Sequence, residues 1–137
     1  MAGFAQKHGW LAGIDLQSDE RARGNAEFAG LYRQAAARGL RLKAHAGEHG
    51  GPRNVRDAVE LCGVRHISHG IRAAEDPALL ASLARDGVWL HVCPTSNVRL
   101  RACESLRAHP LRALHSAGVR CTVSSDDPLL FDTDITR

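Results

Sequence analysis

Four short polar segments of this chain contain the residue types that metal-assisted hydrolysis requires. Imidazole and carboxylate groups bind Zn²⁺ and similar ions, and a bound ion lowers the pKa of its water to about 7. A Glu three residues after a ligating His would lie beside the ion and could move protons to or from a substrate. The segments that carry these groups are His45-Ala-Gly-Glu48, His69-Gly70, Cys93-Pro-Thr-Ser-Asn97 and Ser124-Ser-Asp126-Asp127-Pro128.

The adjacent carboxylates of Asp126 and Asp127 are expected to have different roles. Side chains alternate in direction along extended backbone, so the two cannot face the same way there. One could therefore bind a metal ion while the other faces a substrate. The simpler alternative is that the pair caps a helix that begins at Pro128.

Each polar segment follows a short apolar run that is typical of a strand buried on both faces. The predicted strands are 11–16, 40–45, 64–69, 88–92 and 119–123. Stretches with amphipathic spacing lie between them, and each ends near a Gly. These predicted helices are 26–37, 53–62, 76–85 and 109–117. The alternation implies a parallel sheet with right-handed crossovers, which gathers the polar segments at the carboxyl ends of its strands.

The chain length limits the possible folds. Five strands in 137 residues amount to a little over half of a (β/α)8 TIM barrel, which needs about 250 residues. A small doubly wound sheet, complete in itself, is the alternative that strand spacing leaves open. No Gly-x-Gly-x-x-Gly follows a strand, which disfavours a dinucleotide-binding fold. We expect residues 1–137 to form a single α/β domain.

Composition excludes several classes of protein. The net charge is only +3, the arginines are scattered and aromatic residues make up 4%, so a nucleic-acid partner is not expected. The chain has no apolar run of about 18 residues and no signal-type segment, which predicts a cytosolic protein without a membrane partner. No Cys-x-x-Cys pair occurs, and we interpret the cysteines as reduced core residues. They are Cys62, Cys93, Cys103 and Cys121.

Other polar residues are given structural interpretations. Asn97 is expected to orient its loop through backbone contacts, and His109 to cap a helix. His91 is expected to be packed or hydrogen-bonded within its strand, and His66 to face the helices or solvent. Three acidic residues in and after the first strand could line the mouth of a pocket or cap the following helix, and capping is the favoured interpretation: Asp15, Asp19 and Glu20.

In their order and separation, the four polar segments resemble the signature blocks of the adenosine and adenine deaminase family, a branch of the amidohydrolase superfamily. The segment Gly13-Ile-Asp-Leu-Gln-Ser-Asp-Glu20 resembles a substrate-facing strand end of the same family. The likeness extends from about Leu11 to Asp132. It implies a TIM barrel, one zinc ion in a complete site and a small purine substrate, with this chain as the C-terminal portion of the barrel.

Carried over position by position, the resemblance implies roles for five residues. His45 and Asp126 would be zinc ligands. Glu48 would donate a proton to N1 of the purine ring, and His69 would orient the water that zinc binds, with deprotonation of that water as a further implied role. Asp127 would hydrogen-bond a ring nitrogen of the substrate. The implied reaction is hydrolytic deamination of adenosine or a related 6-aminopurine at C6, giving inosine or hypoxanthine and ammonia.

Two departures from the family pattern leave alternatives open. The family takes two further zinc ligands from a His-x-His pair, and this chain contains no such pair. Ser18 stands where the family has an adenosine-binding Gly. The alternatives are an amidohydrolase acting on another amino-substituted ring and a catalytically inactive half-barrel. Because a half-barrel has open sheet edges, we expect it to associate with the missing N-terminal half or with a second copy.

Overall fold

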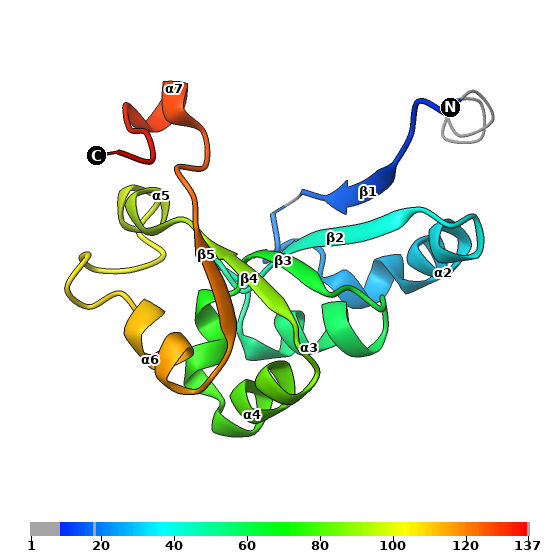
Figure 1. Ribbon diagram of the computed structural model, residues 1–137, viewed down its shortest axis with the longest axis horizontal. Helices are drawn as coiled ribbons and strands as arrows, with labels where there is room; N and C mark the ends of the chain where they lie inside the picture. Colours follow the sequence, from blue (N-terminus) through cyan, green and yellow to red (C-terminus); the bar gives the residue numbers. More distant parts are fainter. Residues whose placement is uncertain (1–8, 18, 137) are drawn as a thin grey trace.

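The computed structural model of the protein describes residues 9–17 and 19–136. Within them, five parallel strands form one sheet in the order β1-β2-β3-β4-β5, and helices alternate with the strands (Figure 1). The strands are β1 (Gly13–Leu16), β2 (Arg41–Ala46), β3 (His66–His69), β4 (Trp89–Val92) and β5 (Arg120–Val123). The helices are α2 (Ala29–Ala37), α3 (Pro52–Glu60), α4 (Pro77–Arg85), α5 (Pro94–Arg99), α6 (Leu111–Ser116) and α7 (Pro128–Phe131), with short 3-10 helices η1 (Asn25–Phe28) and η2 (Ile71–Glu75).

The five predicted strands and the four predicted helices are confirmed, with strand ends that differ by one or two residues. Helix α5 was not predicted from the sequence, and α7 was considered only as the alternative in which a helix begins at Pro128. They contain six and four residues, which is too short to show amphipathic periodicity over two turns. Both begin with a proline at the first helical position, where its fixed φ and missing N–H are tolerated.

The sheet topology distinguishes between the two folds that the sequence leaves open. Strand order follows chain order, and Figure 1 shows α2, α3, α4 and α6 on one side of the sheet. A doubly wound sheet reverses its strand order and carries helices on both faces. The arrangement is therefore that of a partial (β/α)8 barrel. No helix in the described ranges is long and apolar enough to cross a membrane.

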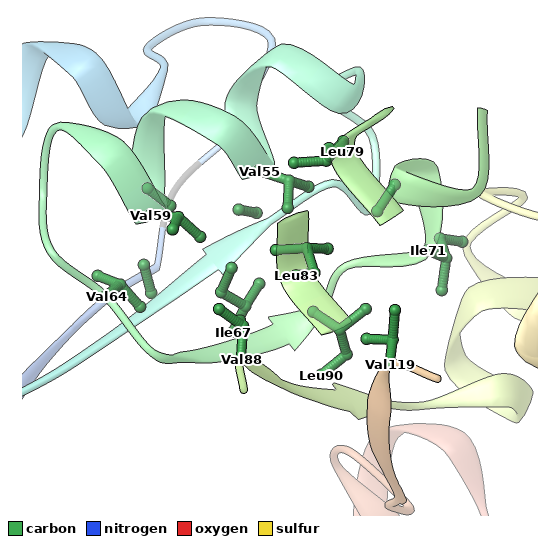
Figure 2. Packing of buried hydrophobic residues seen from close by; sticks show 14 of the residues in the cluster. Val55, Val59, Val64, Ile67, Ile71, Leu79, Leu83, Val88, Leu90 and Val119 are labelled. Carbon is green, nitrogen blue, oxygen red and sulfur yellow. The ribbon is translucent and has the colours of Figure 1, made fainter. Parts of the chain in front are cut away.

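The hydrophobic core lies between the sheet and this layer of helices (Figure 2). Ile67 of β3 and Leu90 of β4 are fully buried against the helices, and Val55, Leu79 and Leu83 of α3 and α4 are between 0% and 2% exposed. Burial of each such side chain contributes about 1.5–3 kcal/mol. This core fixes the positions of the strands and therefore of their carboxyl ends.

The other face of the sheet carries polar side chains. His66 and His91 stack there, with ring centroids 5.3 Å apart, and His66 Nδ1 lies 3.1 Å from His91 Nε2. His91 Nδ1 lies 2.8 Å from Thr122 Oγ1 on β5. The predictions that His91 is hydrogen-bonded and that His66 faces solvent are confirmed.

Candidate functional site

The five residues predicted to be functional lie at the carboxyl ends of three strands. His45 is in β2, Glu48 follows it in the next loop, and His69 is the last residue of β3. Asp126 and Asp127 follow β5. His45, Glu48 and Asp126 each lie near His69. The carboxylate of Asp127 instead accepts hydrogen bonds from N–H groups of α7.

His69 is the centre of this cluster and is only 2% exposed. Its ring centroid lies 5.4 Å from that of His45, and its Nδ1 lies 3.5 Å from Glu48 Oε1. A ligand atom of His69, one of Cys93 and one of Asp126 all lie within 4.8 Å of one another. Side chains from four strand ends therefore meet around one buried imidazole.

A left-handed backbone conformation directs two of these side chains. In a regular strand His69 would share the helix-facing side with Ile67, because side chains alternate. His69 has φ 65° and Asp126 has φ 64°, a conformation that costs about 1–2 kcal/mol for a residue with a Cβ. Such strain is concentrated at functional sites. The premise of extended backbone therefore fails for Asp126, whereas Asp127 is extended, with φ −93° and ψ 100°.

Burial shifts the pKa of both proposed proton-handling groups toward their neutral forms. It raises the pKa of Glu48, and the positive charge of His49 and a hydrogen bond from Asn97 only partly oppose this shift. Burial lowers the pKa of His69 to about 4, against the attraction of Asp126. At neutral pH His69 is therefore an uncharged imidazole, and Glu48 is easier to protonate than an exposed carboxyl.

The ring of His45 is oriented by Asp15 on the neighbouring strand β1. Its Nδ1 lies 3.2 Å from Asp15 Oδ1, and Asp15 Oδ2 lies 3.3 Å from Lys43 Nζ. Burial raises the pKa of Asp15, but the hydrogen bond and charge of His45 and the charge of Lys43 together bring it below its usual value. A carboxylate on Nδ1 places the imidazole proton there and presents Nε2 as a metal ligand.

Glu20 holds the backbone of the loop that contains Glu48. Its carboxylate accepts hydrogen bonds from the N–H groups of Gly47 at 2.6 Å, Glu48 at 2.9 Å and His49 at 3.4 Å. It also accepts one from Asn54 Nδ2 at 2.6 Å. Successive N–H groups around an anion form a stable nest. The carboxylates of Asp15, Asp19 and Glu20 all have partners other than a helix N-terminus, so the capping interpretation is wrong for all three.

Gly47 and Gly70 allow the two loops to approach closely. Both have positive φ, 70° and 72°. A Cβ on Gly70 would lie 2.5 Å from Leu90 Cδ2, and one on Gly47 would overlap Val55 Cγ2. The glycines of the two polar segments are therefore required by packing behind the site.

Asn97 contacts two of the predicted site residues, which was not predicted from the sequence. Its side chain is fully buried in α5, and its Nδ2 lies 2.9 Å from Glu48 Oε1 and 3.1 Å from His69 Nδ1. The signal was available, because Asn97 belongs to the polar segment after β4. It was interpreted as a loop residue because α5 is too short to be predicted.

The donor atoms around His69 fit a zinc ion. Zinc prefers nitrogen, oxygen and thiolate sulfur ligands, and ligand atoms of these types from His69, Cys93 and Asp126 lie together; His45, a predicted ligand, is not in this group. Cys93 was predicted to be a core residue, yet its Sγ belongs to the group with His69 and Asp126. Burial raises the pKa of the Cys93 thiol to about 12, so without a metal ion this sulfur stays protonated.

Asp127 lies at the edge of the cluster and caps α7. Its Oδ1 accepts hydrogen bonds from the N–H groups of Leu129 at 3.0 Å and Leu130 at 2.9 Å. The helix-capping alternative for this residue is therefore confirmed, and its substrate role stays a prediction that would use Oδ2. Ser18, on which the alternative substrate depends, lies outside the described residues.

A cavity of about 340 Å³ opens beside His45 and Glu48. This volume is within the usual range of about 300–1,000 Å³ for small-molecule sites. A larger open hollow of about 1330 Å³ between α6 and β5 lies outside this cluster, although His109 lines it. The smaller cavity is the one lined by two predicted site residues, His45 and Glu48. Its lining residues are Gln17, Asp19, Glu20, Arg21, His45, Glu48, His49 and Leu100.

A parallel partial barrel with histidine and carboxylate side chains at its carboxyl end defines the class of (β/α)8 barrels that carry a site at this face. Comparison with known families narrows this class. The adenosine deaminase family model matches residues 2–137, and the chain belongs to that family.

Curated relatives share close to half of their matched residues with this chain. The adenine deaminase of Streptomyces coelicolor is 49% identical over 121 residues, which are 88% of this chain and 36% of the relative. The adenine deaminase of Sinorhizobium fredii is 44% identical over 132 residues, 96% of this chain and 41% of the relative. The chain thus spans well under half the length of these relatives.

Solved structures confirm the fold. The adenine deaminase of Arthrobacter aurescens superposes with a TM-score of 0.92 at 40% identity, covering 98% of this chain and 41% of that one. An amidohydrolase from Burkholderia ambifaria with bound zinc has a TM-score of 0.82 at 35% identity, covering 90% of this chain and 35% of that one.

Proposed function

We propose that this chain contributes to a zinc-dependent site that hydrolytically deaminates a 6-aminopurine, with adenine as the preferred substrate. The observation that carries the proposal is the cluster itself. A partly buried carboxyl with a raised pKa, Glu48, lies beside a neutral imidazole, His69, with His45 and Asp126 next to that imidazole. Relatives that are 42–49% identical and named adenine deaminase support adenine over adenosine.

His45 Nε2 and the Asp126 carboxylate would hold the zinc ion, and Asp15 would keep the ring of His45 turned toward it. This choice is supported by the bond of Asp15 to His45 Nδ1 and by the position of both proposed ligands beside His69. A structural neighbour with bound zinc supports this choice of metal. When bound, zinc would act as a Lewis acid that makes water a nucleophile near neutral pH. A third protein ligand is expected from outside these two residues, because catalytic zinc usually has three.

Glu48 would deliver a proton to N1 of the purine ring. Burial favours its protonated form, and the cavity of about 340 Å³ reaches its side chain. Protonation of the ring makes C6 easier for water to attack, and the C6–N bond then breaks to release ammonia. Neutral His69 would orient the attacking water, and Asp127 Oδ2 would accept a hydrogen bond from the ring.

A chimera tests this proposal. The matching 121 residues of the Streptomyces coelicolor adenine deaminase are replaced by the corresponding segment of this chain, and ammonia release is measured from adenine, adenosine and non-purine aminated rings. We expect turnover of adenine at a rate close to that of the parent enzyme. A folded chimera that binds zinc as the parent does and deaminates no purine would contradict the proposal. A preference for a non-purine ring would favour the other amidohydrolase activity.

A further inference from the structure

Asn97 bridges two groups that would otherwise compete for one proton. Glu48 Oε1 and His69 Nδ1 are only 3.5 Å apart. The amide nitrogen of Asn97 lies 2.9 Å from the first and 3.1 Å from the second. An amide NH2 has two protons, and here each one has an acceptor. Neither Glu48 nor His69 then needs to donate to the other.

The direction of this bridge is set by His109, at the start of the segment that leads into α6. The backbone N–H of Leu111 donates to His109 Nδ1 at 3.1 Å, so Nδ1 carries no proton. In a neutral imidazole the proton is then on Nε2. His109 Nε2 lies 3.2 Å from Asn97 Oδ1 and can donate to it. Burial lowers the pKa of His109, which keeps the ring neutral.

These contacts form a chain of hydrogen bonds in which each group donates to the next, from His109 to Asn97 and from Asn97 to Glu48 and His69. A proton on His109 Nε2 requires that Asn97 present its oxygen to His109 and its NH2 to Glu48 and His69. Because Asn97 is fully buried, its side-chain amide has no water to bond to instead. His69 Nδ1 then accepts a hydrogen bond, so the proton of the neutral ring is on Nε2.

We propose that Asn97, oriented by His109, is a positioning residue that keeps the proton of Glu48 on Oε2 and the proton of His69 on Nε2. The amide donates to Glu48 Oε1, and the acidic proton of Glu48 therefore occupies the oxygen that is not bound to Asn97. Without the amide, Glu48 would donate to His69 Nδ1 and lose the proton intended for the substrate. The value of this arrangement for catalysis rests on the proposed function, whereas the proton positions do not.

The histidine tautomers test the proton positions directly. Nitrogen-15 NMR of the histidine-labelled chain at one neutral pH distinguishes protonated from bare ring nitrogens. We expect His69 and His109 both to have a bare Nδ1 and a protonated Nε2. Asn97→Asp keeps the shape of the side chain but replaces the amide NH2 by a carboxylate oxygen, which can only accept. We therefore expect the proton of His69 to move to Nδ1. A spectrum of His69 that Asn97→Asp leaves unchanged would overturn the proposal.

Two substitutions of His109 separate positioning from helix capping. The oxygen of Asn can replace Nδ1 and keep the bond from Leu111, whereas the amide nitrogen of Gln can replace Nε2 and keep the bond to Asn97. We expect His109→Gln to retain the wild-type His69 spectrum and His109→Asn to lose it, although His109→Asn keeps the cap. The opposite order would show that His109 acts only as a cap.

The chimera described above measures the catalytic consequence. We expect Asn97→Asp to lower kcat for adenine about 10²-fold, the scale of lost general acid catalysis, with a smaller change in KM. His109→Gln should retain more activity than His109→Asn. If the unsubstituted chimera deaminates nothing, the proposed function fails while the NMR result still decides the proton positions. Unchanged kcat in Asn97→Asp would overturn the positioning role.

Discussion

The loops after β2 and β5 carry the two sides of the candidate site, and the structure holds them in different ways. The β2 loop is fixed by distant residues, because Glu20 binds three of its N–H groups and Asn97 binds the side chain of Glu48. The β5 loop is exposed and held locally. Ser124 Oγ accepts from the N–H of Asp126 at 3.4 Å, and Asp127 caps a four-residue helix.

This difference indicates where preorganisation is concentrated. Of the groups proposed to move protons, His69 is buried and Glu48 is partly buried. Both are bound by side chains from other elements, which fixes their geometry before a ligand arrives. The carboxylates proposed to meet zinc and substrate are exposed and have short-range contacts. Substitutions of residues far from the β2 loop in sequence should therefore change its geometry. Substitutions in the β5 loop should change only that loop.

Removal of the proposed acid should give the largest effect. In the active chimera, Glu48→Gln keeps the shape and the acceptor for Asn97 but removes the acidic proton. We expect turnover of adenine to fall about 10²-fold or more, with zinc content unchanged. Steady-state kinetics and metal analysis check this pair of results. Loss of zinc instead would make Glu48 a ligand and contradict its assigned role.

Substitution of Glu20, which holds the β2 loop, should give the second-largest effect. The two carboxylate oxygens of Glu20 accept from three backbone N–H groups. In Glu20→Gln one of these oxygens becomes an NH2 group, which cannot accept and faces other donors. We expect a loss of about 1–3 kcal/mol in the free energy of unfolding, typical of unsatisfied buried donors, and lower turnover. Urea denaturation measures the first. Asp19→Asn is the matched control, because the Asp19 carboxylate binds only its neighbour Arg21 in the contacts described. An equal loss of stability in Asp19→Asn would contradict the role of Glu20 in holding the β2 loop.

The buried imidazole predicts a dependence of stability on pH. The pKa of His69 is lowered in the folded chain to about 4 from 6.5, so the unfolded chain binds a proton that the folded chain does not. The free energy of unfolding should therefore fall as the pH decreases from about 6.5 to about 4. We expect a smaller fall in His69→Gln, with the exposed His115→Gln as control. Equal slopes in all three proteins would show that His69 does not contribute.

A local substitution in the β5 loop should have the smallest effect on stability. Asn is as good a helix cap as Asp, so Asp127→Asn should change the free energy of unfolding by only a few tenths of a kcal/mol. If Asp127 Oδ2 binds the purine ring, KM for adenine should rise in the chimera while kcat changes less. A large loss of stability would show that the β5 loop depends on more than the cap.

The sequence predicted the strands because β-branched and apolar residues form short buried runs, as at Ile67 and Leu90. Glu48 and His69 were predicted to be near each other because strand ends of a parallel sheet share one edge. Glu20 and Asn97 could not be predicted in the same way. Their roles depend on contacts 27 to 49 residues away in sequence, and a lone Glu or Asn has no spacing signal. The cytosolic location and the absence of membrane or nucleic-acid partners stay predictions.

Zinc binding tests most directly the central claim that His45 and Asp126 converge on one metal ion. Zinc content of the chimera is measured for His45→Ala, Asp126→Ala and Cys93→Ser. Cys93→Ser is the matched control, because Cys93 lies in the same cluster but its thiol stays protonated in the metal-free site. We expect the first two variants to lose zinc and the third to retain it. Full zinc in His45→Ala together with loss of zinc in Cys93→Ser would contradict the account.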